Sequence, residues 1–149
     1  MSDILDLNGK VTLVTGAGQG VGRQIALHFA AHKAAGVVVN DYFLDRAEQV
    51  AREINAAGGK AIAAQADVTD LASVRAMIGQ AERAFGPVDV LVNNAGNAGA
   101  TPDPDARKPF WETGPEVWNS FIGVNLYGVI NCASACIPQM IERKGGRIV

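Results

Sequence analysis

The stretch "KVTLVTGAGQGVG" (residues 10–22) decides the fold class, because an apolar run leads directly into a glycine-rich turn. The run at 10–15 is short and nearly continuous, which is typical of a strand covered on both faces in a parallel sheet. Glycine then occupies alternate positions: Gly16, Gly18, Gly20 and Gly22. Without Cβ atoms, this turn can approach a ligand closely and adopt positive φ. The helix beyond it offers unpaired N–H groups and a positive dipole end, which together suit a pyrophosphate.

The same strand–helix unit recurs along the chain. Further short apolar runs lie at 36–40, 60–66 and 88–93, each bounded by Gly, Pro or Asp. Helical periodicity lies between them, with one stripe formed by Val21, Ile25 and Phe29 and two others within 44–54 and 71–85. This alternation predicts an α/β fold with a doubly wound parallel sheet of the Rossmann type. Its ligand crevice is expected at the carboxyl ends of the strands.

The last third of the chain is less regular. Residues 97–114 are rich in Pro, Gly and Asp and are expected to form a loop. A helical pattern over 113–144 has Pro115 near its first turn and Pro138 where a kink is expected. "GGRIV" (145–149) then begins a fifth strand that stops after three residues. We therefore expect one dinucleotide-binding domain, truncated in its fifth strand and incomplete at the C-terminus.

The composition is that of an ordinary globular chain, with 48% hydrophobic and 19% charged residues. The length (1–149) fits a single domain. A net charge of −2 gives no reason to expect nucleic acid as a partner. The N-terminus carries acids where a signal peptide would carry bases, and no apolar run approaches the ~20 residues that span a bilayer. We expect a cytoplasmic protein without a membrane partner.

Neither the cysteines nor the histidines predict a metal site. Cys132 and Cys136 are the only cysteines, so no disulfide framework is implied, and the small residues around them favour close helix packing. His28 and His32 lie one helical turn apart, as in a zinc protease, but Phe29 stands where that motif needs a glutamate. We expect no metal.

Two acidic residues at strand ends are candidate binding residues. Asp41 ends the second strand, 19 positions beyond Gly22, where a carboxylate can accept hydrogen bonds from ribose hydroxyls. This favours NAD over NADP, because a carboxylate repels a 2′-phosphate and Gln19 in the turn is neutral. Asp67 follows the third strand, where it accepts a bond from the adenine amino group, caps the next helix, or does both. A solvent-exposed role for Asp41 is the competing interpretation.

Five motifs occur in a characteristic order: "TGAGQGVG" (15–22), "ND" (40–41), "DV" (67–68), "NNAG" (93–96) and "VNLYG" (124–128). With them, the chain resembles the short-chain dehydrogenase/reductase family from about Asn8 to its last residue. The resemblance implies roles for a set of residues. Gly16, Gly20 and Gly22, with the backbone of Gln19 and Val21 between them, would hold the cofactor pyrophosphate. Asp41 would bind the adenosine ribose, Asp67 and the Val68 amide would bind adenine, and Asn94, Ala95 and Gly96 would form a wall beside the cofactor. Thr15 and Asn93 would tie strand ends together.

The family's chemistry is hydride transfer between nicotinamide and an alcohol or ketone substrate, assisted by a tyrosine, a lysine and a serine. By resemblance, Asn125 is the one catalytic residue in this chain and anchors a water in the proton relay; an asparagine satisfied within its helix is the alternative. The tyrosine and lysine come as YxxxK, yet Arg46 follows Tyr42 and Asn131 follows Tyr127 at that spacing. The resemblance implies an NAD-preferring alcohol dehydrogenase or ketoreductase, a homodimer or homotetramer when complete. Residues 1–149 alone are expected to be inactive.

Two other functions fit parts of the pattern. A class I S-adenosylmethionine methyltransferase also uses GxGxG and strand-end acids, but has no use for "NNAG" or "VNLYG". A non-catalytic nucleotide-binding module of this natural length would be soluble and monodisperse on its own. Equilibrium titration with NADH and with S-adenosylmethionine separates the first alternative, because only one ligand should saturate the site.

Overall fold

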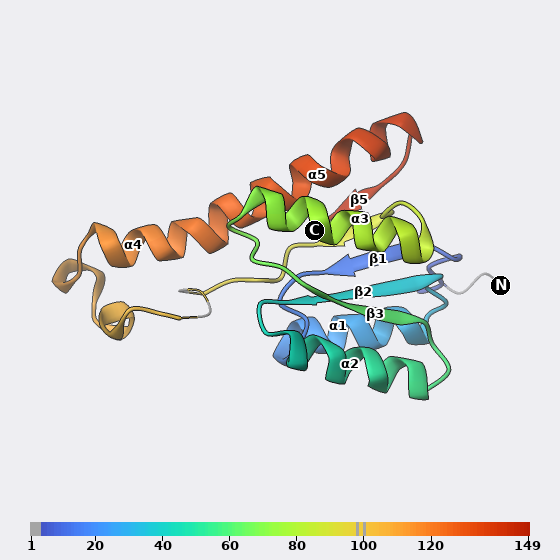
Figure 1. Ribbon diagram of the computed structural model, residues 1–149, viewed down its shortest axis with the longest axis horizontal. Coiled ribbons are helices and arrows are strands. Elements are labelled where there is room, and N and C mark those ends of the chain that lie inside the picture. The colour runs from blue at the N-terminus through green and yellow to red at the C-terminus, as the bar shows by residue number, and fades with distance from the viewer. Residues whose placement is uncertain (1–3, 98, 100) are drawn as a thin grey trace.

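A five-stranded parallel sheet forms the centre of the protein (Figure 1). The computed structural model describes residues 4–97, 99 and 101–149. The strand order is β3-β2-β1-β4-β5. The strands are β1 (Val11–Val14), β2 (Gly36–Asp41), β3 (Ala61–Gln65), β4 (Val90–Val92) and β5 (Arg147–Ile148). The order reverses direction beside β1, which makes the carboxyl ends of β1 and β4 the topological switch point.

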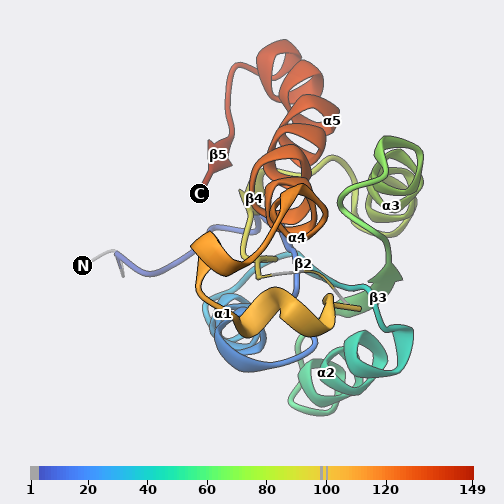
Figure 2. The ribbon, with the colours of Figure 1, turned by 90° about the vertical axis from the view of Figure 1, so that its left-hand side faces the viewer.

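Helices cover both faces of this sheet, which confirms the predicted doubly wound architecture. Helices α1 (Gly20–Ala31) and α2 (Leu44–Ala56) lie on one face. Helices α3 (Leu71–Phe85) and α5 (Gly128–Glu142) lie on the other. Figure 2 shows the two pairs on opposite sides of the strands.

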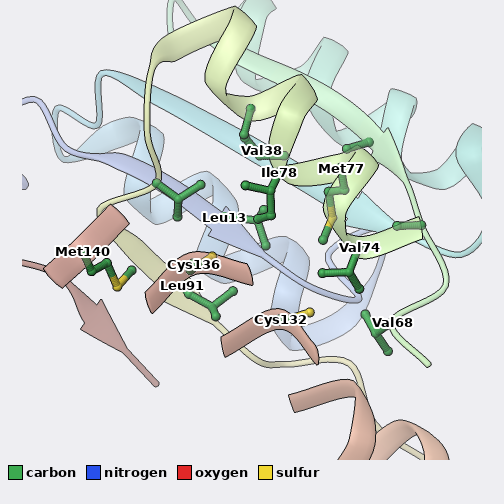
Figure 3. Packing of buried hydrophobic residues seen from close by; sticks show 14 residues of the cluster. Leu13, Val38, Val68, Val74, Met77, Ile78, Leu91, Cys132, Cys136 and Met140 are labelled. Atoms are coloured by element: carbon green, nitrogen blue, oxygen red, sulfur yellow. The ribbon is translucent and has the colours of Figure 1, made fainter. Parts of the chain in front are cut away.

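The two hydrophobic clusters explain why the strand sequences are continuously apolar. Side chains alternate along a strand, so Leu13 of β1 packs towards α3 and α5 while Val14 packs towards α1 and α2. Figure 3 shows the first cluster, in which Leu13 lies among side chains of α3 and α5. Both faces are buried, so most positions of either alternation are apolar, and the buried Thr12 hydroxyl donates to the Gly36 carbonyl.

The expected fifth strand is present at the edge of the sheet. Arg147 pairs with Val90 and Ile148 pairs with Leu91, in parallel register. The Val149 amide also donates to the Leu91 carbonyl at 2.9 Å. The "GGRIV" prediction is therefore confirmed as a strand beside β4.

Helix α1 buries a different face from the one that its large apolar residues suggested. Val21 is 70% exposed, whereas Gly22 and Ala26 are buried. Small residues at this i, i+4 pair let the helix backbone approach the sheet closely. The predicted stripe of large apolar residues is therefore not the buried face of α1. Ile25 and Phe29 are only partly buried, at the edge of the second cluster.

The long C-terminal helical pattern is interrupted before its proline. Helix α4 (Pro115–Ile122) passes into a π-helical turn (Gly123–Tyr127) and then into α5. Pro138, where the sequence predicts a kink, lies inside α5. The π turn, which the sequence did not predict, begins fifteen residues earlier, at Gly123. Single π turns are frequent at functional sites. Figure 1 shows α4 projecting away from the sheet.

The segment before α4 has more order than a loop. Two short 3-10 turns occur in it, Pro104–Arg107 and Phe110–Glu112. Asp103 caps the first turn by accepting from the Asp105 amide at 2.8 Å. We use the name "arm" for residues 101–127, which comprise these turns, α4 and the π turn.

One helical stretch meets the length and hydropathy criteria for a membrane span, contrary to the expectation from sequence. It is Pro115–Glu142, with a mean hydropathy of 1.5 over its most apolar window. Only 17% of that window is buried, although α5 places Cys132, Cys136 and Met140 in the first cluster. By itself the stretch is weak evidence for a membrane.

Candidate functional site

A cavity of about 860 Å³ lies at the carboxyl ends of the strands, where the topology predicts a ligand. Residues from the turns after β1, β2, β3 and β4 line it, together with residues of α4 and the π turn. The predicted site residues on its wall are Gly16, Gln19, Gly20, Val21, Asp41, Asp67, Val68, Asn94, Ala95 and Gly96. The fold thus gathers in one place residues that the sequence spreads over 80 positions. Gly22 and Asn125 do not line the described cavity wall but lie behind it.

The glycine turn is held in a conformation that its sequence predicts. Gly16 and Gly20 have φ of +60° and +57°. A Cβ on Gly16 would lie 2.9 Å from the Ala95 Cα atom, so a side chain there would separate the β1 and β4 turns. Gln19 precedes α1 in an extended conformation, and within the described chain its side chain makes no capping bond. The first amides of α1 are therefore available to an anion at the cavity.

Gly22 serves the packing beneath this turn. A Cβ at this position would overlap the Asn94 side-chain amide and lie 2.6 Å from the Gly16 carbonyl oxygen. Glycine is needed because α1 passes directly against the turn after β4. The structure therefore places Gly22 as a support of the predicted pyrophosphate site.

Asp41 is fixed at the cavity wall by backbone amides. Its Oδ2 atom accepts from the Gly18 amide and its Oδ1 atom accepts from the Phe43 amide, both at 3.0 Å. The residue is 6% exposed. Two amide donors fix the orientation of the carboxylate. The solvent-exposed alternative for Asp41 is therefore wrong.

Asp67 is not the residue that caps helix α3. Asp70 caps α3 by accepting from the Ala72 amide at 2.9 Å. Asp67 Oδ1 instead accepts from the amide and the hydroxyl of Thr69, at 2.9 and 2.7 Å. Among the described residues, no donor contacts Asp67 Oδ2. Asp67 therefore stabilises its own turn and keeps one carboxylate oxygen for the cavity.

Thr15 joins the ends of β1 and β4, as predicted. Its hydroxyl oxygen accepts from the amides of Asn94 and Ala95, both at 3.0 Å. The Asn94 side chain returns two bonds, to the carbonyls of Thr15 (2.9 Å) and Gly16 (3.1 Å). Asn93 contributes through its backbone, which donates to the Val149 carbonyl at 2.8 Å. Its buried Nδ2 atom has no hydrogen-bond partner among the described residues.

Asn125 lies in the π turn and binds the chain that leaves β4. Its Oδ1 atom accepts from the Asn97 amide at 3.2 Å. Its Nδ2 atom donates to the carbonyls of Asn97 and Phe121, both at 2.8 Å. Two of these bonds cross to the segment after β4 and one stays within the helical stretch, so protein groups satisfy the amide, and the relay role of Asn125 stays a prediction.

Two contributors to the site escaped the sequence analysis. Arg46 lines the cavity from the first turn of α2. Asn131 of α5 donates to the carbonyls of Val68 and Thr69, at 3.0 and 3.2 Å, and so supports the turn after β3. No local motif marks either residue. Arg46 and Asn131 only occupy the lysine position of YxxxK after Tyr42 and Tyr127, which indicates no role for either.

The two cysteines are buried, and the two histidines lie against one another. Burial raises the pKa of Cys132 to about 12, and the neighbouring Cys136 adds to the shift. Burial also raises the pKa of Cys136 to about 11, with Glu82 contributing. His28 and His32 stack with ring centroids 6.3 Å apart. In the described part of the chain, no group of three or more His, Cys, Asp or Glu residues could hold a metal ion.

A sequence model described as short chain dehydrogenase matches residues 10–149, and the chain belongs to this family. Oxidoreductase UcpA of Salmonella typhimurium is 39% identical over 143 residues, which cover 96% of this chain and 51% of that protein. The 5-keto-D-gluconate 5-reductase of Escherichia coli is 35% identical over 149 residues, 100% of this chain and 56% of that protein. The chain thus spans about half the length of the curated relatives that it matches.

Solved structures show the same fold. A 7 alpha-hydroxysteroid dehydrogenase complexed with NADH and 7-oxo glycochenodeoxycholic acid gives a TM-score of 0.87 at 33% identity, over 99% of this chain and 55% of that one. A gluconate 5-dehydrogenase from Burkholderia cenocepacia in complex with NADP and tartrate gives 0.82 at 37% identity, over 97% of this chain and 53% of that one. One neighbour therefore holds NADH and the other NADP.

Proposed function

We propose that this chain is the cofactor-binding part of an oxidoreductase that transfers hydride between a nicotinamide cofactor and a small alcohol or ketone. The family, the cavity at the switch point and the nicotinamide cofactors of the structural neighbours support this proposal. We further propose that NAD is preferred over NADP.

The observation that carries the cofactor preference is the Asp41 carboxylate. It lies at the end of β2, held by the Gly18 and Phe43 amides, with its charge on the cavity wall. A carboxylate in this place accepts hydrogen bonds from both hydroxyls of the adenosine ribose. It repels the 2′-phosphate that distinguishes NADP, because two negative groups would meet in a half-enclosed site.

The other wall residues complete the proposed dinucleotide site. The α1 amides beyond Gln19 and Gly20 would receive the pyrophosphate, since they lack partners and carry the positive end of the helix dipole. Asp67 Oδ2 would accept from the adenine amino group, with the Val68 amide beside it. Asn94, Ala95 and Gly96 would guide the nicotinamide half across the end of β4. When bound, the cofactor supplies the hydride chemistry.

Asn125 is proposed as a relay residue that acts from behind this wall. Its side chain clamps the Asn97 backbone and lies behind Gly96, where an added Cβ would be 3.0 Å from Asn125 Oδ1. This oxygen accepts one described bond and keeps a lone pair for a water molecule. Turnover also needs a Tyr–Lys pair, which these 149 residues do not contain, so we propose that they bind cofactor without catalysis.

Assembly as a homodimer or homotetramer is part of the same proposal. The outer face of the long helical stretch exposes Ile122, Leu126 and Ile130, spaced four residues apart. Sedimentation velocity should then give a species heavier than one chain. A single monomeric species at all concentrations would contradict the assembly and leave the cofactor proposal standing.

Equilibrium titration tests the proposed function. We expect NADH to saturate the protein, NADPH to bind about tenfold more weakly or worse, and S-adenosylmethionine not to bind. Asp41→Asn should reduce the preference for NADH, because it removes the charge and keeps the size. Asp45→Asn is the matched control, since Asp45 is exposed in the first turn of the same helix region and lies off the described cavity wall. Saturation by S-adenosylmethionine in place of NADH would refute the proposal.

A further inference from the structure

Local hydrogen bonds give the turn after β3 its shape. The Asp67 carboxylate accepts from the Thr69 amide and hydroxyl, at 2.9 and 2.7 Å. The Asp67 carbonyl accepts from the Asp70 amide at 3.1 Å, and the Asp67 amide donates to the Ser73 hydroxyl, also at 3.1 Å. All these partners lie within the turn or at the start of α3, so these bonds do not fix the turn against the other side of the cavity.

Asn131 of α5 supplies a long-range contact to this turn. Its Nδ2 atom donates to the carbonyls of Val68 and Thr69, which precede it by 63 and 62 positions in the sequence. The backbone of α5 also comes close at the same place, because a Cβ on Gly128 would lie 2.7 Å from the Val68 Cγ2 atom. No residue of α5 lies on the described cavity wall. The helix therefore holds the turn from behind.

These bonds leave the Val68 amide without a partner among the described residues. The peptide group after Val68 is engaged at both ends, because its carbonyl accepts from Asn131 and the Thr69 amide donates to Asp67 Oδ1. Val68 is only 7% exposed, and it lines the cavity. A buried N–H group without an acceptor costs free energy, so this amide favours a ligand atom that accepts from it.

An unengaged acceptor and an unengaged donor therefore lie on adjacent residues of the cavity wall, Asp67 Oδ2 and the Val68 amide. Adenine complements this pair, because its amino group is a donor and the neighbouring ring nitrogen N1 is an acceptor. Hypoxanthine presents the reverse pattern, with a carbonyl oxygen in place of the amino group and a hydrogen on N1. A site that hydrogen-bonds one pattern rejects the other, since its buried polar groups are then left unpaired.

We propose that Asn131 is a positioning residue that makes the cavity selective for adenine over other purines. This inference rests on the proposed function, because it assumes that the cavity binds a nicotinamide dinucleotide. With Asn131 in place, the carbonyls of Val68 and Thr69 are fixed against α5, and the donor and acceptor stay in register with the purine edge. Without it, the turn keeps its local shape but shifts relative to the glycine turn that receives the pyrophosphate.

The test compares the dissociation constants of NADH and of its reduced hypoxanthine analogue, followed by nicotinamide fluorescence. We expect the wild-type protein to bind NADH about tenfold more tightly than the analogue or better. Asn131→Leu removes both donated bonds at similar size and should bring the two dissociation constants to within about threefold of each other, chiefly by weakening NADH.

Asn55 offers a matched control at the other end of the same strand. Its side chain in α2 also makes two bonds to backbone, accepting from the Ala61 amide at 2.8 Å and donating to the Ala61 carbonyl at 3.0 Å. Asn55→Leu should therefore lower the free energy of unfolding in urea, as Asn131→Leu does. Only Asn131→Leu should change the ratio of the two dissociation constants, which distinguishes positioning from a loss of stability.

The outcomes separate this inference from the proposed function. If Asn131→Leu keeps the wild-type ratio, or if Asn55→Leu changes the ratio as much, Asn131 does not position the purine site and the inference is overturned. Equal binding of NADH and the analogue by the wild-type protein also overturns it, and leaves the proposed function standing. Should Asn131→Leu fail to fold, Asn131→Ala gives the same comparison. If the wild-type protein binds neither dinucleotide, the proposed function itself fails.

Discussion

The carboxyl ends of β1 and β2 are built in the opposite way to the arm. At these strand ends, the polar side chains Thr15, Asn40 and Asp41 are at most 6% exposed, and each bonds to a backbone group. In the arm, Phe110 and Trp111 are 71% and 72% exposed. Polar groups are enclosed in one region while large aromatic groups face solvent in the other.

This difference arises from how far apart in the sequence the bonded residues lie. Bonds at these strand ends include pairs 23 to 80 positions apart in the sequence, such as Gly18 to Asp41 and Ala95 to Thr15. Side-chain bonds within the arm join positions two to five apart, such as Trp118 to Thr113. Asn125 is the exception that reaches back to Asn97. The parallel sheet determines the first region, whereas local chain geometry determines most of the second.

The largest expected effect is the difference in thiol labelling rate between the native and the denatured protein. Cys132 and Cys136 have pKa values raised to about 12 and about 11, so their thiolate fraction near pH 8 is lower than in the unfolded chain by a factor of about a hundred to a thousand. We expect a thiol reagent to label the native protein that much more slowly than the protein in denaturant. Rapid labelling of the native protein would show that the packed region opens readily.

The same shifts predict how stability depends on pH. Both thiols hold their protons more tightly when folded, so the unfolded chain loses protons first as the pH rises. Their contribution is complete below about pH 9 and is lost between there and about pH 12. Urea unfolding at increasing pH should show this decline, and a Cys132→Ala, Cys136→Ala double variant should show less of it.

A core substitution should cost the next largest amount. Leu13 is fully buried between β1 and the α3–α5 face. Leu13→Ala should lower the free energy of unfolding by about 3 kcal/mol, from lost transfer energy and the cavity that remains. Urea denaturation followed by circular dichroism measures this. A loss below about 1 kcal/mol would mean that the packed region is far looser than the structure indicates.

Alanine substitutions at Gly9 and Gly16 distinguish the cost of a strained backbone conformation from the cost of a steric clash. Gly16 and Gly9 both have positive φ, +60° and +71°, but a Cβ on Gly9 would meet nothing within 4 Å. Gly9→Ala should therefore cost only the backbone term, about 1 kcal/mol. Gly16→Ala should cost about 2 kcal/mol and also weaken NADH binding, because the new methyl group pushes the turn away from Ala95. Equal costs for the two variants would remove the argument for close packing between the β1 and β4 turns.

The smallest effect is expected in the arm. Leu126 is 52% exposed in the π turn. Leu126→Ser should change the free energy of unfolding of the isolated chain by less than about 0.5 kcal/mol. The control is Leu13→Ala under the same conditions. A loss near that of Leu13 would show that Leu126 is buried in solution, as it would be in an assembly.

The sequence predicted the packed region well and the arm poorly, for the same physical reason. The strands, their parallel arrangement and the strand-end residues follow from apolar runs and from parallel topology, which leaves few arrangements. The Val21 stripe failed because close packing selected the small residues Gly22 and Ala26. Arg46 and Asn131 could not be found by spacing, since their roles depend on partners that only the folded chain brings near. The π turn at Gly123 has no sequence rule that predicts it.

The bond from Asn131 to the turn after β3 makes helix placement and ligand binding thermodynamically linked. Val68 lines the cavity and also lies against α5. A Cβ placed on Gly128 of α5 would be 2.7 Å from the Val68 Cγ2 atom. A molecule that orders the Val68 turn must therefore also favour the docked position of α5, and a partner that holds α5 in place must raise affinity for that molecule by the same factor. Amide hydrogen exchange in α5 should slow when the Val68 side of the cavity is filled, although no residue of α5 lies on the described cavity wall.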